Sequence, residues 1–112
     1  MKYTLEQLQS MSDLDLNIAV TKSQGFVVDG WYENTSVVIA VDENGNNGFQ
    51  SDYCNKPSDM CELIISEGIS LIYQIDNNYW CASTMNTPFV HDKNPLRAAA
   101  IVYVLVRQVQ GI

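Results

Sequence analysis

The longest apolar run of the chain lies near its C-terminus, where residues 98–106 carry no polar group except the hydroxyl of Tyr103. Asn94 and Pro95 precede this run and are typical of a helix start, because Asn94 can accept from free backbone N–H groups and Pro95 lacks an N–H. Gly111 follows as a predicted stop. A helix that is apolar on every side must be covered on every side. We therefore predict a central helix that is wrapped by the rest of the chain or completed by a second copy in a homodimer.

Three earlier stretches have the spacing and the end signals of helices. A capping-box pattern predicts a short helical turn over residues 5–11. Ser12 predicts the start of an amphipathic helix that ends at Gly25. A further helix is predicted to begin at Pro57 and to end at Gly68.

Between these helices, four short runs are rich in β-branched and aromatic residues, which indicates strands. The predicted strands cover residues 26–32, 36–41, 69–75 and 79–84. Turn residues separate the members of each pair, so two antiparallel hairpins are expected, and residues 85–93 are predicted as an irregular link. The order α-β-β-α-β-β-α predicts an α+β fold, in which a small antiparallel sheet of two hairpins packs with three helices. The length of 112 residues, without an internal repeat, suits a single domain.

The composition indicates which kinds of partner the protein can bind. Thirteen acidic residues stand against six basic ones, for a net charge of −7. The basic residues form no cluster, so we expect no direct binding of nucleic acid, whereas docking onto a basic partner is compatible with this charge. A sharper hypothesis is that the acidic surface mimics DNA to block a host protein. The apolar run is shorter than a membrane span and is cut by Arg97 and Arg107, so we expect no membrane segment.

The residues that usually carry catalysis are few. His91 is the only histidine, and a Cys–His nucleophile pair would need one of the three cysteines beside it. Three cysteines cannot all pair within one chain, and without an N-terminal apolar signal we expect reduced thiols and a cytoplasmic location; these residues are Cys54, Cys61 and Cys81. The acidic loop at residues 42–48 lacks the closing glutamate of a calcium loop. Zinc and phosphate-binding motifs are also missing from the sequence, so we expect no metal and no cofactor and lean against an enzyme.

Arg97 falls in the first turn of the predicted central helix, where a positive charge opposes the helix dipole. We therefore expect a compensating ion pair or bidentate hydrogen bond, with Asp52 as the best candidate partner. Two roles remain open for Arg97. It is either a lock between two elements or an anchor for an anionic ligand or a partner's carboxylate.

The aromatic residues offer two further hypotheses. Most are expected in the core or on a sheet face, but Trp31 and Trp80 on neighbouring strands could together form the floor of a shallow groove. The rival to a protein-binding role is a small-ligand binder or minor enzyme with a pocket between the hairpins. That pocket would gather Tyr53, Trp80, His91 and Arg97.

Two motifs carry a resemblance to a known family. The segment Asp52-Tyr53-Cys54-Asn55-Lys56-Pro57, followed by Glu67-Gly68-Ile69-Ser70-Leu71, resembles the central pattern of the NinX-like proteins of lambdoid phages and prophages. Asn94-Pro95-Leu96-Arg97-Ala98-Ala99 and the N-terminal helix are similar to that family too. The resemblance implies a small protein of phage, prophage or other mobile DNA that acts in the bacterial cytoplasm, and it implies no catalytic residue. The leading hypothesis is a non-enzymatic protein that binds a host or phage macromolecule.

Overall fold

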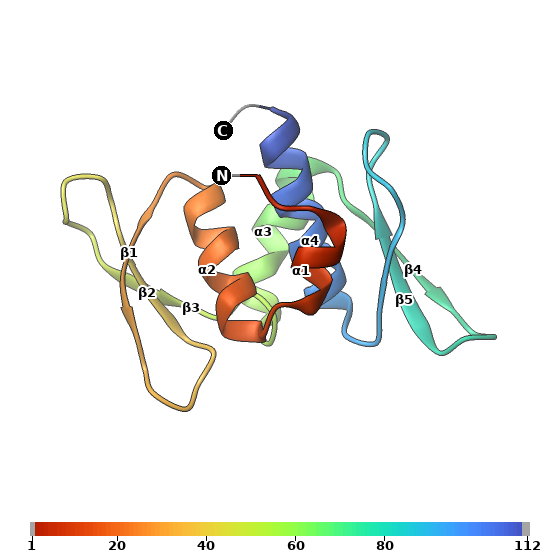
Figure 1. Cartoon of the computed structure of the whole chain (residues 1–112), viewed down its shortest axis with the longest axis horizontal. Coiled ribbons are helices and arrows are strands. Elements are labelled where there is room, and N and C mark those ends of the chain that lie inside the picture. The colour runs from red at the N-terminus through yellow and green to blue at the C-terminus, as the bar shows by residue number, and fades with distance from the viewer. Residues whose placement is uncertain (1, 111–112) are drawn as a thin grey trace.

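Helix α4 (Pro95–Val109) lies at the centre of the computed structural model, which describes residues 2–110 (Figure 1). The side chain of Asn94 accepts hydrogen bonds from the N–H groups of Leu96 and Arg97, as a helix cap does. Every residue from Ala98 to Val104 is buried inside the one chain. The predicted central helix is therefore confirmed and is wrapped by its own chain, while its predicted stop at Gly111 lies outside the described residues. Within the described chain, no helix is both long enough and apolar enough to cross a membrane.

Three other helices pack against α4, namely α1 (Leu5–Ser10), α2 (Asp13–Ser23) and α3 (Pro57–Glu67). Their ends follow the predicted signals. Thr4 and Gln7 form a capping box at α1, and the side chain of Ser12 caps α2. Gly68 closes α3 in the left-handed conformation, with φ of 63°, which glycine adopts without strain.

The strands form two separate antiparallel sheets on opposite sides of the helices (Figure 1). Sheet A contains β1 (Val27–Trp31), β2 (Val38–Val41) and β3 (Phe49–Ser51), and sheet B contains β4 (Ser70–Gln74), β5 (Tyr79–Ser83) and β6 (Val90–Asp92). The α+β class is confirmed, and the predicted order α-β-β-α-β-β-α matches the structure roughly, with a third strand in each sheet and the short helix α1 before α2. The expectation of one small sheet is wrong, because the helical layer lies between the two hairpins.

The third strand of each sheet was not predicted. Strands β3 and β6 have three residues each, which is too short for a period of two to stand out in the sequence. Each is recognisable only from its neighbour, since β3 pairs with β2 and β6 pairs with β5. The stretch at residues 85–93, predicted as an irregular link, therefore contains a strand.

A helix followed by a three-stranded meander occurs twice along the chain, first as α2 with sheet A and then as α3 with sheet B. Each meander leads to a proline that opens the next helix, Pro57 in α3 after the cap residue Lys56 and Pro95 in α4 after the cap residue Asn94. Helices α2, α3 and α4 therefore begin at the same end of the molecule, the lower end in Figure 1. This arrangement brings the motif residues of three segments together.

Candidate binding surface

The carboxylate of Asp52 is the centre of a polar network at the end where α2, α3 and α4 begin. It accepts hydrogen bonds from Asn17 Nδ2 at 2.7 Å, Ser36 Oγ at 2.7 Å and Asn55 Nδ2 at 3.1 Å. The buried Asn17 also accepts from the backbone N–H of Cys54 at 3.0 Å. The network joins sheet A, through Ser36 and Asp52, to helix α2 and to the start of α3. We name the group of Asn17, Ser36, Asp52 and Asn55 the Asp52 latch.

Arg97 is compensated by two carboxylates, and neither belongs to Asp52. Its guanidinium lies 2.8 Å from Asp13 Oδ1 and 3.2 Å from Asp92 Oδ2. It also donates to the backbone carbonyls of Gln9, at 3.1 Å, and Met11. The predicted pair with Asp52 is therefore wrong. Asp52 turns toward α2 and the start of β2, whereas Asp13 and Asp92 reach Arg97 from the start of α2 and the end of β6.

Asn94 connects this end of α4 to the segment before α3. Its side-chain amide donates to the carbonyl of Cys54 at 2.6 Å, while its side-chain oxygen caps α4. The donors of Arg97 and Asn94 are thus engaged within the chain, and the Arg97 side chain is only 13% exposed. These contacts are those of a lock between elements.

The two buried thiols, Cys54 and Cys81, lack the features of an activated nucleophile. Burial, together with the charge of Asp13, raises the pKa of Cys54 to about 12, so its thiol stays protonated at neutral pH. Cys81 lies directly opposite the exposed His91 on the neighbouring strand, and burial raises the pKa of Cys81 as well. Among residues 2–110, no group of three or more His, Cys, Asp and Glu side chains is placed to hold a metal ion.

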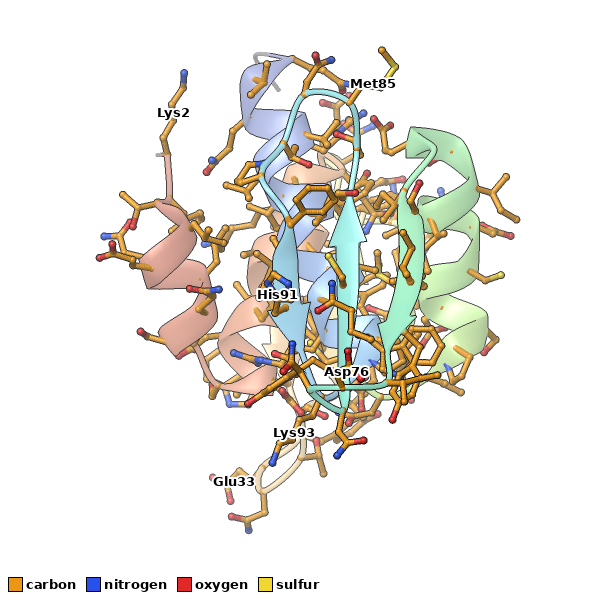
Figure 2. The ribbon with its side chains drawn as sticks, turned by 90° about the vertical axis from the view of Figure 1, so that its right-hand side faces the viewer. Lys2, Glu33, Asp76, Met85, His91 and Lys93 are labelled. Carbon is orange, nitrogen blue, oxygen red and sulfur yellow. The ribbon has the colours of Figure 1, made fainter. Side chains whose placement is uncertain are left out.

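The aromatic residues considered for a common site lie apart. Tyr53 is 3% exposed, and its hydroxyl accepts a hydrogen bond from Gln24 Nε2 at 2.8 Å. Trp31 is on sheet A and Trp80 is on sheet B, so the two tryptophans are not on neighbouring strands and the predicted shared groove is wrong. Trp80 packs against Tyr73, with ring centroids 5.3 Å apart. Figure 2, which faces sheet B, shows His91 on the outer surface of that sheet.

A partly open cavity of about 350 Å³ lies at the other end of α4 from Arg97. It is lined by the ends of α3 and α4 and by the loop between β5 and β6. Glu67 is one of the lining residues, and its carboxylate accepts a hydrogen bond from Gln110 Nε2 at 2.9 Å and lies 3.9 Å from Arg107. This cavity and the predicted pocket around Arg97 are therefore different places.

Exposed large apolar residues gather on the two sheets and their loops rather than on the helices. Among residues 2–110, only Ile65 and Val109 of this set belong to helices. On sheet A and its first turn, the exposed fractions are 53% for Trp31, 48% for Val27 and 46% for Tyr32. Such rings are enriched where proteins bind one another. The sheets, and not the polar end of the helices, therefore present the candidate binding surfaces.

A shallow groove of about 470 Å³ runs between α2 and β1 and is mainly apolar. Its lining residues are Ile18, Lys22, Phe26, Val27, Val28 and Trp31. Acidic side chains stand at both ends of β1. Asp29 and Glu33 lie two positions before and after Trp31, at one end of β1. Asp42 and Glu43 directly follow Val41, which pairs with Val27 at the other end of β1. Glu33 projects away from the body of the molecule (Figure 2).

Sequence reasoning named Trp31 but missed the rest of this surface. Tyr32, Val27 and the three exposed acids Asp29, Glu33 and Glu43 were not singled out. One signal could have found them, because residues 23–55 contain five acidic residues and no lysine or arginine. That bias is visible only when charge is counted by segment rather than over the whole chain.

The chain is similar to a known protein family over most of its length. The family model described as "Bacteriophage P22, NinX" matches residues 7–107, which run from Gln7 in α1 to Arg107 in α4 and include α2, α3 and both sheets. Neither a curated protein nor a solved structure matches the chain. The match covers the Asp52 latch, the Arg97 contacts and the groove beside Trp31.

Proposed function

Since the chain belongs to the NinX family of bacteriophage P22, we propose that this phage protein works without catalysis, by binding a protein partner through sheet A. The observation that carries the proposal is the exposed apolar and aromatic surface around Trp31, which borders a groove on an otherwise acidic sheet. Tryptophan is among the residues that contribute most to protein–protein binding.

The free thiols support a bacterial cytoplasmic location for this activity. All three cysteines are unpaired, and Cys61 is exposed. Reduced thiols persist in the cytosol and are oxidised in secretory compartments. The partner is therefore a host or phage protein of the same compartment.

The rival role, a small-ligand pocket or minor enzyme near Arg97, has less support. The guanidinium of Arg97 is held by two carboxylates and two backbone carbonyls, and Cys54 is buried and protonated. A homodimer at α4 has less support as well, because the apolar residues of that helix are buried inside one chain. The partner we propose is thus a different protein.

A photo-crosslinking amino acid at position 31 tests the proposal in bacteria that produce the phage. The matched control carries the same amino acid at position 65, where Ile65 is 74% exposed on α3. We expect a discrete crosslinked protein from position 31 and none of the same size from position 65. Identical products from both positions, or no product from position 31, would contradict the proposal.

A further inference from the structure

The charge of sheet A defines which partner it suits. Of the five acids between residues 23 and 55, Asp52 is engaged in its latch and Asp42 accepts hydrogen bonds from Asn44, Asn46 and Asn47 of its own loop. The remaining three, Asp29, Glu33 and Glu43, are exposed, and no hydrogen bond or ion pair is recorded for their side chains within residues 2–110. Their charge is therefore free to meet a partner.

The lining of the groove is mainly apolar, whereas the residues around it are acidic. The groove's volume of about 470 Å³ and its mainly apolar lining suit one or two apolar side chains. Lys22 belongs to the lining, so a positive charge placed inside the groove would be repelled. Apolar character is thus favoured at the centre, beside Trp31, and positive charge at the two ends of β1.

Resting on the proposed binding role of sheet A, we propose that its occupant is a basic protein segment with an apolar anchor. The anchor packs against Trp31 and Val27 in the groove, and flanking Lys or Arg side chains meet Asp29, Glu33 and Glu43. A second copy of the chain is disfavoured here, because it would place acids against acids. Nucleic acid is disfavoured because its phosphates would be repelled by the same carboxylates.

Three short peptides with the same central leucine test this inference, with flanks of Lys and Arg, of Ser, or of Glu. Their binding is followed by tryptophan fluorescence in the Trp80→Phe variant, in which Trp31 is the remaining tryptophan. We expect the basic peptide alone to saturate the signal at or below about 1 mM, with weaker binding as salt is added.

Two matched variants locate the interaction, since each removes three exposed acidic charges. Asp29→Ser/Glu33→Ser/Glu43→Ser changes sheet A, and Glu6→Ser/Glu62→Ser/Asp76→Ser changes α1, α3 and the β4–β5 turn. The sheet A variant should weaken binding of the basic peptide about tenfold, and the control variant less than about threefold. Circular dichroism confirms that both variants are folded.

The outcomes separate this inference from the proposed function. Equal binding of the basic and Ser-flanked peptides, equal weakening in the two variants, or no peptide binding would each overturn the basic-segment inference. If position 31 still crosslinked a protein in those cases, the binding role would stand with a partner of other chemistry. If the basic peptide bound as expected but position 31 crosslinked nothing in cells, the proposed function would fail instead.

Discussion

Sheet A and sheet B have the same number of strands and the same connectivity, but they contribute differently to the core. Ile69, Ala82 and Val90, from sheet B and the residue before it, pack in the main core cluster around α4. In sheet A, Val38 and Ala40 are fully buried, yet neither belongs to that cluster. Sheet B is built on α4, whereas sheet A packs on α2.

The contacts that attach each sheet to the helices differ in kind as well as in number. Sheet B is held by apolar contacts of β5 and β6 with α4, and sheet A is tied to α2 partly by the Asp52 latch. Burial of apolar area is the larger source of stability, so sheet B should open only with the whole fold and sheet A should open more easily.

The two tryptophans make this comparison measurable, because Trp31 reports on sheet A and Trp80 on sheet B. Arg97→Ala should have the largest effect, a loss of about 2–4 kcal/mol in the free energy of unfolding, since it leaves Asp13 and Asp92 without their cation. Urea unfolding of single-tryptophan variants should show the loss with both reporters. Arg107→Ala, whose nearest carboxylate is 3.9 Å away, should lose about 1 kcal/mol. An unchanged melt of Arg97→Ala with lost partner binding would show that Arg97 is an anchor instead.

A matched pair of valines tests whether the sheets differ in core packing. Val90 in sheet B and Val38 in sheet A are both fully buried. Val90→Ala should lower the free energy of unfolding by about 2–3 kcal/mol and Val38→Ala by about 1 kcal/mol, because a cavity beside α2 can collapse more easily than one in the main core. Urea denaturation with both reporters measures the two losses. Equal losses would show that sheet A is as integral to the fold as sheet B.

Breaking the Asp52 latch should lower the local stability of sheet A and leave that of sheet B nearly unchanged. Asp52→Ala removes the acceptor that Asn17, Ser36 and Asn55 share; Ser36 Oγ then lacks an acceptor, while Asn17 keeps the carbonyl of Ser36 and Asn55 keeps Asp13 and Ser36. Amide hydrogen exchange in β1 and β2 should become about 5- to 30-fold faster, as a local loss of one or two kcal/mol implies. Exchange in β5 should change far less. An equal acceleration in both sheets would mean that they open as one unit.

Ser51 points to an imperfection in sheet A. Within residues 2–110, its Oγ is the one buried side-chain nitrogen or oxygen atom that has no hydrogen-bond partner. Ser51→Ala removes that unsatisfied hydroxyl and should stabilise the protein by up to about 1 kcal/mol. The gain should be larger in urea unfolding followed by Trp31 fluorescence than in unfolding followed by Trp80. Ser83→Ala, at a partly exposed position of β5, is the matched change in sheet B and should be close to neutral. A clear destabilisation by Ser51→Ala would show that the hydroxyl has a role.

The smallest effect is expected in the loop between β2 and β3. Hydrogen bonds from the backbone of Asn46, the side chain of Asn47 and the backbone of Asn44 lower the pKa of Asp42. A lowered pKa in the folded state adds stability at neutral pH, and that stability is lost as the pH falls through the folded pKa. Asp42→Ala should therefore speed amide exchange of Asn44 and Asn46 at neutral pH, and the difference from the parent should vanish in acid. A difference that persisted in acid would assign the effect to packing of the loop.

Much of the fold could be predicted because its signals are local. Asn94 and Pro95 open α4, Ser12 caps α2, and Gly68 closes α3, each through contacts with residues only a few positions away. The four longer strands were found for the same reason. Strands β3 and β6 were missed because three residues cannot show a period, and their pairing partners lie in other strands.

The candidate site could be predicted only in part. The family motif residues Asp52, Asn94 and Arg97 were recognised, but their contacts were not, since the partners of Arg97 lie 84 and 5 positions away along the chain. Trp31 was recognised as a possible binding residue, but its position on a different sheet from Trp80 could not be seen.

The sequence by itself determined the helices, the hairpins, the acidic charge and the apolar segment that forms the central helix α4. Each of these depends on short-range propensity or on composition. The tertiary structure alone decided that α4 lies between two sheets, that Arg97 meets Asp13 and Asp92, and that the aromatic groove of sheet A is left open. Those features depend on which faces meet across long separations in the chain. Side-chain packing and hydrogen-bond geometry select that arrangement, and neither is encoded in any single stretch of residues.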